Sequence, residues 1–270
     1  MAQKKFQELH LKDAFLFAAA LSDEDTCRML LELILGEPVN GVTVHAEHTS
    51  LFSSDYRSIR LDIYAQAGTE ACYDVEMQGE DKGNLPKRSR YYQAQMDVTS
   101  LKPGTNFNEL RECYVIFLCT FDPFNMGLYR YTFENSCRET GQPLEDGTKK
   151  IFLNTKGKND QDEPAALREF LHYVENSTEE FAISCDSPTV KLLHKKITVL
   201  KQSREWERRY MTIGDLLDDA RSAALQESQQ RFTTLIKKMS EAGEVDKLPL
   251  LSDPAFLEEM YQKYQLSISI

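Results

Sequence analysis

The sequence predicts an α/β protein of the mixed α+β kind: a central mixed sheet with helices on its faces, followed by a helical region. Two helical stretches precede a group of strand-like runs, one later run is apolar throughout, and the final third is helical in pattern. The 270 residues, 41% of them hydrophobic and 28% charged, are enough for one large domain or for a domain with an appendage.

Capping residues and alternating polarity predict the first elements. Residues 9–36 contain two helical pieces, with Ser22 or Asp23 as the cap of the second and Gly36 as its end. Three strands are expected next, near residues 42–49, 58–65 and 71–78.

A helix is expected over residues 86–101, because Pro86 suits a first helical turn and the sequence PGTN ends the pattern. The run CYVIFLCTF that follows is continuously apolar, as in a strand buried on both faces, so it belongs near the middle of the sheet. Shorter strands are expected at residues 128–134 and 149–154, with a turn signal at Asp146-Gly147 between them.

From about residue 163 the pattern is helical to the end, with breaks near 176–178, 184–188 and 249–254. We therefore predict a first domain over residues 1–175 and a helical C-terminal extension over residues 176–270. The stretch LSDPAFLEEMYQKY is typical of a short capped helix. The apolar spacing of the extension favours a helical pair that folds on itself, and a dimerisation or partner-docking element is the alternative.

Composition excludes several classes of protein. No run of 18 apolar residues is present, and the N-terminus lacks a signal peptide, so a cytoplasmic protein without a membrane span is expected. The net charge of −11 argues against a protein that coats nucleic acid nonspecifically. Residues 187–211 nevertheless carry seven basic and two acidic side chains, which predicts a solvated helix face or a stripe that follows phosphates.

The cysteines and histidines give no metal signature. The six cysteines contain no C-x-x-C pair and fall mostly among apolar residues, as small core side chains do. His45 and His48 lie three apart in a predicted strand, which would direct them to opposite faces and disfavours a zinc site.

The hairpin IRLDIYAQAGTEACYDVEMQ is unusual because its polar positions are acidic. On its second strand Asp74, Glu76 and Gln78 share one face. Asp62, on the first strand, lies on that face only if the residue numbers of cross-strand partners add up to an even number. The sequence does not decide this. Converging carboxylates would repel each other unless a proton or a hard cation such as Mg²⁺ lay between them. The alternative is a solvated acidic hairpin.

The predicted helix after the hairpin is basic. Lys87, Arg88 and Arg90 are followed directly by Tyr91 and Tyr92. Beside an acidic metal site, these cations could hold the phosphates that the carboxylates repel. An amphipathic helix that packs its tyrosines on the sheet is compatible with this interpretation.

At these residues the chain resembles the PD-(D/E)XK nuclease superfamily, and more closely the bacterial PD-(D/E)XK nuclease family transposases, which are related to recombination-promoting nucleases. The resemblance covers about residues 10–175 and extends to about 211. It implies a restriction-endonuclease-like sheet and a nuclease-like first domain. The ordered motifs that carry it are RLDIYA, YDVEMQ, LPKRSRYYQAQMD, YVIFLCTFDPF, YTFENSC, DGTKKIFLNTKG and LHYV.

The resemblance also implies roles for single residues. Asp62 would be the aspartate of the motif, Glu76 would take the (D/E) position, and Gln78 would stand where the family usually has lysine. The preceding helices often add an acid, for which Asp13 is the first candidate and Glu32 the second. The carbonyl of Met77 would be a further metal ligand.

The expected function is therefore a Mg²⁺- or Mn²⁺-dependent DNA endonuclease, with a link to DNA recombination or mobile elements. Asp62 and Glu76 would hold the metal, and Gln78 would position the attacking water. The expected DNA contacts are Lys87, Arg88, Arg90 and Tyr92. A homodimer would let two sites address two strands. A catalytically inactive DNA- or protein-binding module with the nuclease fold is the alternative.

Overall fold

The computed structural model describes residues 4–50 and 59–266. It divides into two compact units, Met1–Glu207 and Arg208–Ile270. The first contains the sheet and the second is helical. The domain boundary expected at residue 175 stays a prediction.

The first unit is built on a six-stranded mixed sheet with the strand order β1-β2-β3-β4-β6-β5. Strands β1 to β3 form an antiparallel meander, β4 pairs parallel with both β3 and β6, and β5 pairs antiparallel with β6. The strands are β1 Val42–Ser50, β2 Ile59–Ala67, β3 Ala71–Gln78, β4 Glu112–Cys119, β5 Arg130–Phe133 and β6 Thr148–Asn154.

The apolar strand β4 lies inside the sheet, as its sequence predicts. From Cys113 to Cys119 every side chain is buried. A strand with a parallel neighbour on each side and helices over both faces has no wet side, so it carries apolar residues continuously.

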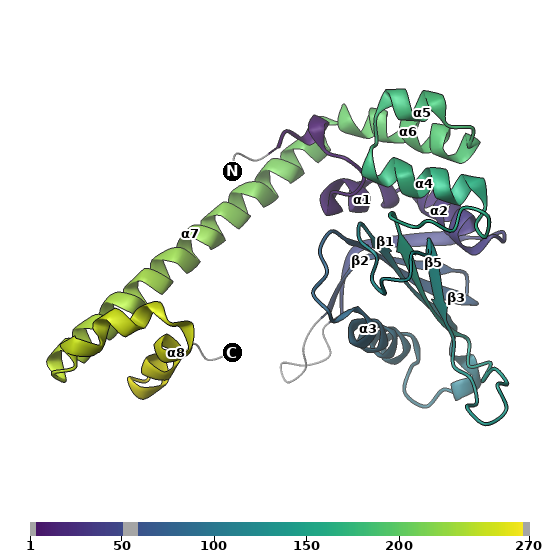
Figure 1. Cartoon of the computed structure of the whole chain (residues 1–270). Coiled ribbons are helices and arrows are strands. Elements are labelled where there is room, and N and C mark those ends of the chain that lie inside the picture. The colour runs from purple at the N-terminus through teal and green to yellow at the C-terminus, as the bar shows by residue number, and fades with distance from the viewer. Residues whose placement is uncertain (1–3, 51–58, 267–270) are drawn as a thin grey trace. The chain divides into compact units, whose positions relative to one another are not determined.

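Helices cover both faces of this sheet (Figure 1). Helix α3 lies on one face, and α1, α2, α4, α5 and α6 lie on the other. Their bounds are α1 Ala14–Leu21, α2 Glu24–Leu35, α3 Leu85–Ser100, α4 Ala165–Glu175, α5 Glu179–Ser184 and α6 Pro188–Lys201. Short 3-10 helices occur at Phe6–Glu8 and Phe107–Glu109.

The predicted caps of α2 are confirmed. The Asp23 carboxylate accepts a hydrogen bond from the backbone N–H of Thr26 at 2.9 Å, which satisfies a donor that the first helical turn leaves free. Gly36 ends the helix with a φ of 78°, a conformation that costs glycine little because it has no Cβ.

The second unit has a small core of its own. Helix α7 (Arg204–Glu241) begins in the first unit, and the 3-10 helix Val245–Ser252 and α8 (Pro254–Lys263) follow it. The predicted capped helix is confirmed as α8, because Asp253 accepts from the N–H of Phe256. Five buried side chains form the core of this unit: Leu235, Met239, Leu251, Met260 and Tyr261.

The ends of α6 and α7 were not expected from the sequence. The chain leaves helix at Gln202 and Ser203, and again at residues 242–244. Only the second break contains a glycine, Gly243, and neither contains a proline. The helical pattern of the sequence therefore continues across both breaks and does not mark them.

Several surface and composition features complete the description. All six cysteines are free, and five are buried, with Cys137 the exposed one. His45 is exposed and stacks on Tyr64, whereas the side chain of His48 lies outside the described residues.

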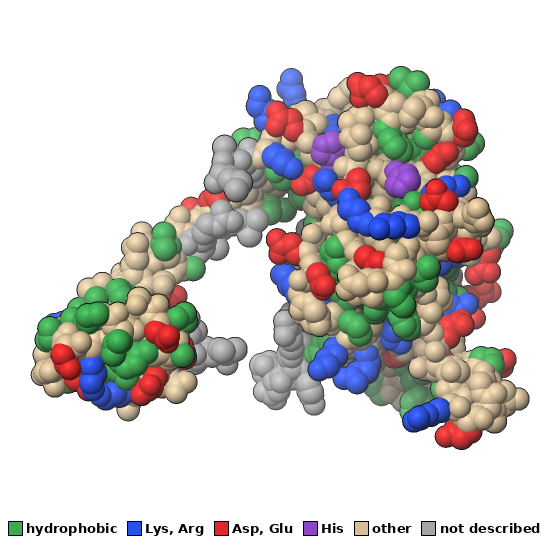
Figure 2. Space-filling model, in the orientation of Figure 1, with side chains coloured by type: hydrophobic (Ala, Val, Ile, Leu, Met, Phe, Trp, Pro, Cys, Tyr) green, Lys and Arg blue, Asp and Glu red, His purple; other side chains and the backbone are tan. Residues whose placement is uncertain are grey.

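In residues 4–50 and 59–266 no helix is long and apolar enough to span a membrane. Acidic and basic side chains are interspersed over the face in Figure 2.

Candidate active site

The turn between β2 and β3 decides which side chains share a face. Ala67 pairs with Ala71, so residues 68–70 form a three-residue loop, and Gly68 adopts a φ of 54°. The next pairs, Tyr64 with Asp74 and Ile63 with Val75, have even index sums. One step further in this register, Asp62 lies opposite Glu76.

Backbone donors hold these two acids in place. The N–H of Asp62 donates to Oε1 of Glu76 at 3.1 Å, and the N–H of Met77 donates to Oδ2 of Asp62 at 3.2 Å. Each carboxylate thus accepts a hydrogen bond from the neighbouring strand. The convergence that the sequence left open is therefore present.

Arg88 of α3 contacts Glu76 and Gln78. Its Nη2 lies 2.7 Å from Oε2 of Glu76, and its Nη1 donates to Oε1 of Gln78 at 3.0 Å. The Gln78 amide in turn donates to Oε2 of Glu76 at 3.3 Å. The guanidinium carbon lies 5.2 Å from the ring centre of Tyr92 and 5.1 Å from that of Phe117, so two aromatic faces support the cation.

Asp74 adds a third acid on the same face of β3. Its side chain is fully buried, and neither carboxylate oxygen has a hydrogen-bond partner within the described chain. Burial raises its pKa well above the usual 3.8, and the charges of Glu76 and Asp62 raise it further. Burial and the charge of Asp62 also raise the pKa of Glu76 to about 7, although Arg88 opposes that rise. Three carboxyl groups therefore share this face with the guanidinium of Arg88.

The donor chemistry of the site fits a hard divalent cation. Carboxylate and amide oxygens of Asp62, Glu76 and Gln78 are the ligands that Mg²⁺ prefers, and the unpartnered oxygens of Asp74 lie on the same face. The present spacing is less favourable. No three His, Cys, Asp or Glu side chains of residues 4–50 and 59–266 form a group that could hold a metal ion.

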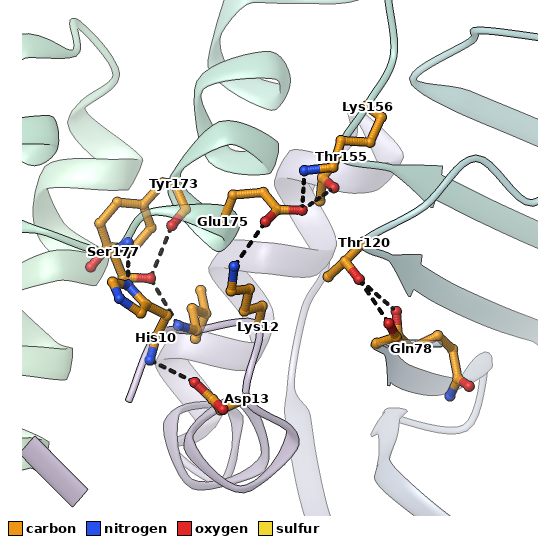
Figure 3. A network of polar contacts seen from close by, with 12 residues as sticks. His10, Lys12, Asp13, Gln78, Thr120, Thr155, Lys156, Tyr173, Glu175 and Ser177 are labelled. Atoms are coloured by element: carbon orange, nitrogen blue, oxygen red, sulfur yellow. Dashed lines mark hydrogen bonds and ion pairs between the residues drawn. The ribbon is translucent and has the colours of Figure 1, made fainter. Parts of the chain in front are cut away.

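Asp13 lies in a different environment. It precedes α1, and its Oδ2 accepts from the N–H of His10 at 2.8 Å (Figure 3). Glu32, the second candidate, accepts from Arg28 and from the N–H of Val39. Asp13 thus bonds to the segment before α1, and Glu32 bonds within α2 and to the segment after it. A role for either acid at the metal stays a prediction.

The predicted DNA-binding residues have different surroundings in the structure. Lys87 and Arg90 are exposed on α3. Tyr92 is half-buried, with its ring stacked on Phe117 at 6.2 Å between centres. Arg88 contacts Glu76 and Gln78 directly, which the sequence did not reveal, since its ten-residue separation from Gln78 crosses a loop. The burial of Asp74 was missed as well, because alternation alone does not show that α3 covers this face.

A second charged network lies at the carboxyl ends of β4 and β6 (Figure 3). Glu175 accepts from Lys12 at 3.1 Å, from Lys156 at 2.8 Å and from the Thr155 hydroxyl at 2.7 Å. Burial alone would raise its pKa, but these donors outweigh it and lower the pKa to about 2. Glu175 thus connects α4 by hydrogen bonds and ion pairs to the N-terminal segment and to the end of β6.

Comparison with known proteins identifies a family. A sequence model of the PD-(D/E)XK nuclease family transposase matches residues 14–226, well over half of the chain. Searches of curated proteins and of solved structures gave no match. The matched range includes the acidic hairpin, α3 and the whole sheet, and the mixed sheet flanked by helices agrees with a restriction-endonuclease-like fold. The chain therefore belongs to the PD-(D/E)XK nuclease family transposases, and the family supports a nuclease-like function with DNA as the substrate.

Proposed function

We propose that the protein is a divalent-metal-dependent DNA endonuclease that hydrolyses phosphodiester bonds. The β2–β3 register carries this proposal, because it brings Asp62 and Glu76 together on one face in a chain of a nuclease family. Mutual repulsion makes two converging acids unfavourable unless a proton or a cation lies between them, and a divalent metal would be such a cation. A role in DNA recombination would follow from the family.

The metal would be held by Asp62, Glu76 and the backbone carbonyl of Met77, with Asp13 as a supporting acid. When bound, Mg²⁺ or Mn²⁺ would activate a water molecule and stabilise the charge that develops on the phosphate. Gln78 would orient that water through its amide. A glutamine lacks the positive charge of the lysine usual in the superfamily. In the structure the guanidinium of Arg88 lies 3.0 Å from the amide oxygen of Gln78, so a positive charge is present beside that position without lysine.

The DNA backbone would lie along α3. Lys87 and Arg90 are exposed there, while Arg88 of the same helix contacts Glu76 and lies over the ring of Tyr92. Contacts of lysine and arginine to phosphates release counterions, so binding should weaken steeply with salt. Basic side chains on one helix also offset the repulsion that a net charge of −11 causes.

Cleavage of supercoiled plasmid with Mg²⁺ or Mn²⁺ tests this proposal. Wild-type protein should nick the plasmid, and Asp62→Asn, Glu76→Gln and EDTA should each abolish nicking. Glu139→Gln, which neutralises an exposed acid in the β5–β6 connector, is the matched control and should nick as the wild type does. Nicking that survives both site substitutions would contradict the proposed site.

A catalytically inactive module with the nuclease fold is the second candidate. Two observations favour it: glutamine stands at position 78, and Oε2 of Glu76 is already occupied by Arg88 and Gln78. Such a module would bind DNA in a salt-dependent manner, equally well with Asp62→Asn and Glu76→Gln, and would not cleave with either metal.

A further inference from the structure

The guanidinium of Arg88 occupies one carboxylate oxygen of a proposed metal ligand, Oε2 of Glu76, and the amide oxygen of Gln78. Oε2 of Glu76 receives two donors, Arg88 Nη2 at 2.7 Å and Gln78 Nε2 at 3.3 Å, which is the capacity of one carboxylate oxygen. The amide oxygen of Gln78 receives Arg88 Nη1 at 3.0 Å. The guanidinium of Arg88 therefore bridges these two oxygens.

This contact is well protected from solvent. The Glu76 side chain is 3% exposed and that of Arg88 is 24% exposed, and the guanidinium lies against Tyr92 and Phe117. A charge-assisted hydrogen bond in such surroundings is stronger than one at an open surface. A second cation at Oε2 of Glu76 would have to displace it.

We propose that Arg88 is an internal counter-cation that competes with the divalent metal for Glu76, and that the metal takes Oε2 of Glu76 only as the guanidinium leaves. This inference rests on the proposed metal-dependent function. In the structure Arg88 contacts Glu76 and Gln78, and no three His, Cys, Asp or Glu side chains of the described residues form a group that could hold a metal ion. The released guanidinium, still carried by α3, would be free to pair with a phosphate oxygen.

Competition has a measurable consequence. If the arginine-free arrangement is populated about one tenth of the time, the apparent dissociation constant of the metal is roughly tenfold weaker than the intrinsic one. Removing the guanidinium should therefore make Mg²⁺ binding about tenfold tighter. Removing a different cation from the same helix should not, since only a long-range charge is lost.

Isothermal titration of Mg²⁺ into the full-length protein provides the test, with Arg88→Met as the variant. Arg90→Met is the matched control, because Arg90 is an exposed arginine of the same helix. The titrations are made at pH 8.5 and 9.0, above the pKa of about 7 of Glu76 in the wild type. Because loss of Arg88 raises that pKa further, an affinity of Arg88→Met that agrees at the two pH values shows that proton competition is small. We expect Mg²⁺ to bind Arg88→Met roughly tenfold more tightly than wild type, with Arg90→Met unchanged.

A second variant and a second measurement guard against misfolding. Arg88→Lys keeps a cation but loses the fork that bridges Glu76 and Gln78, and its Mg²⁺ affinity should lie between those of the other two proteins. Mg²⁺ should also raise the melting temperature of Arg88→Met more than that of wild type.

The outcomes separate the two proposals. Equal or weaker Mg²⁺ binding by Arg88→Met, with clear binding by wild type, would overturn the competition and leave the metal-dependent function standing. Equal tightening by Arg88→Met and Arg90→Met would also overturn it, since the effect would then be one of net charge. Absence of Mg²⁺ binding by every protein would refute both proposals.

Discussion

Asp62 lies opposite Glu76 across the β2–β3 pair, with the backbone N–H of Asp62 3.1 Å from Oε1 of Glu76. The contact joins one strand's backbone to the other strand's side chain, so neither acid can turn away without losing a hydrogen bond. Strand pairing itself therefore maintains a concentration of negative charge on the α3 face. The stability of the site then depends on how that charge is compensated.

Position 78 should be coupled to Arg88. In Gln78→Lys a second cation would replace the acceptor that lies 3.0 Å from the guanidinium, and we expect a loss of about 1 kcal/mol of unfolding free energy. Without Arg88 the repulsion between the two cations is absent. Gln78→Lys should therefore cost much less unfolding free energy in the Arg88→Met background than in the wild type. Urea denaturation of the four proteins in a double-mutant cycle measures the coupling, and strictly additive effects would show that the two residues act independently.

Asp74 should destabilise the protein increasingly as the pH rises. Its pKa is raised in the folded state, so above the usual value of 3.8 the unfolded chain releases a proton that the folded chain retains. Asp74→Leu removes the buried carboxyl and should raise the unfolding free energy by about 1–3 kcal/mol at pH 7.5, with a smaller gain near pH 4.5. Urea denaturation at both pH values checks this, and a pH-independent difference would contradict it.

Glu175 has the opposite pH dependence. Its pKa is lowered from 4.5 to about 2, so its contribution is fully present above pH 4.5 and is lost as the pH falls toward 2. Glu175→Gln should cost roughly 1 kcal/mol at pH 7, a modest value because Lys12 and Lys156 are partly exposed. Thermal unfolding between pH 2 and 7 should show the two proteins converge at low pH, and a constant gap would exclude the ionised network as the cause.

The helical unit at the C-terminus should lose its core without affecting the sheet. Leu235 is fully buried there, and Leu235→Ala should cost about 2–5 kcal/mol within that unit. Hydrogen exchange should then accelerate in α8 while the amides of β3 and β4 stay protected. Phe232→Ala, on an exposed position of the same helix, is the control and should leave exchange in α8 unchanged.

Local signals in the sequence were sufficient for most elements. The alternation in β2 and β3, the continuous apolar run of β4 and the caps of α2 each depend on residues within a few positions of one another. The same alternation identified Glu76 and Gln78 as neighbours on one face, and the ordered motifs identified the family that the comparison confirmed.

Tertiary structure alone decided how those neighbours meet. A one-residue change in the loop at residues 68–70 would have turned Asp62 to the opposite face, and no local pattern specifies that loop's length. Arg88 reaches Glu76, and Asp74 is buried, only because α3 packs across the sheet. Side-chain direction within a strand follows from the two-residue repeat of the backbone, whereas contacts between strands and helices depend on turns and packing, which the periodic pattern does not encode.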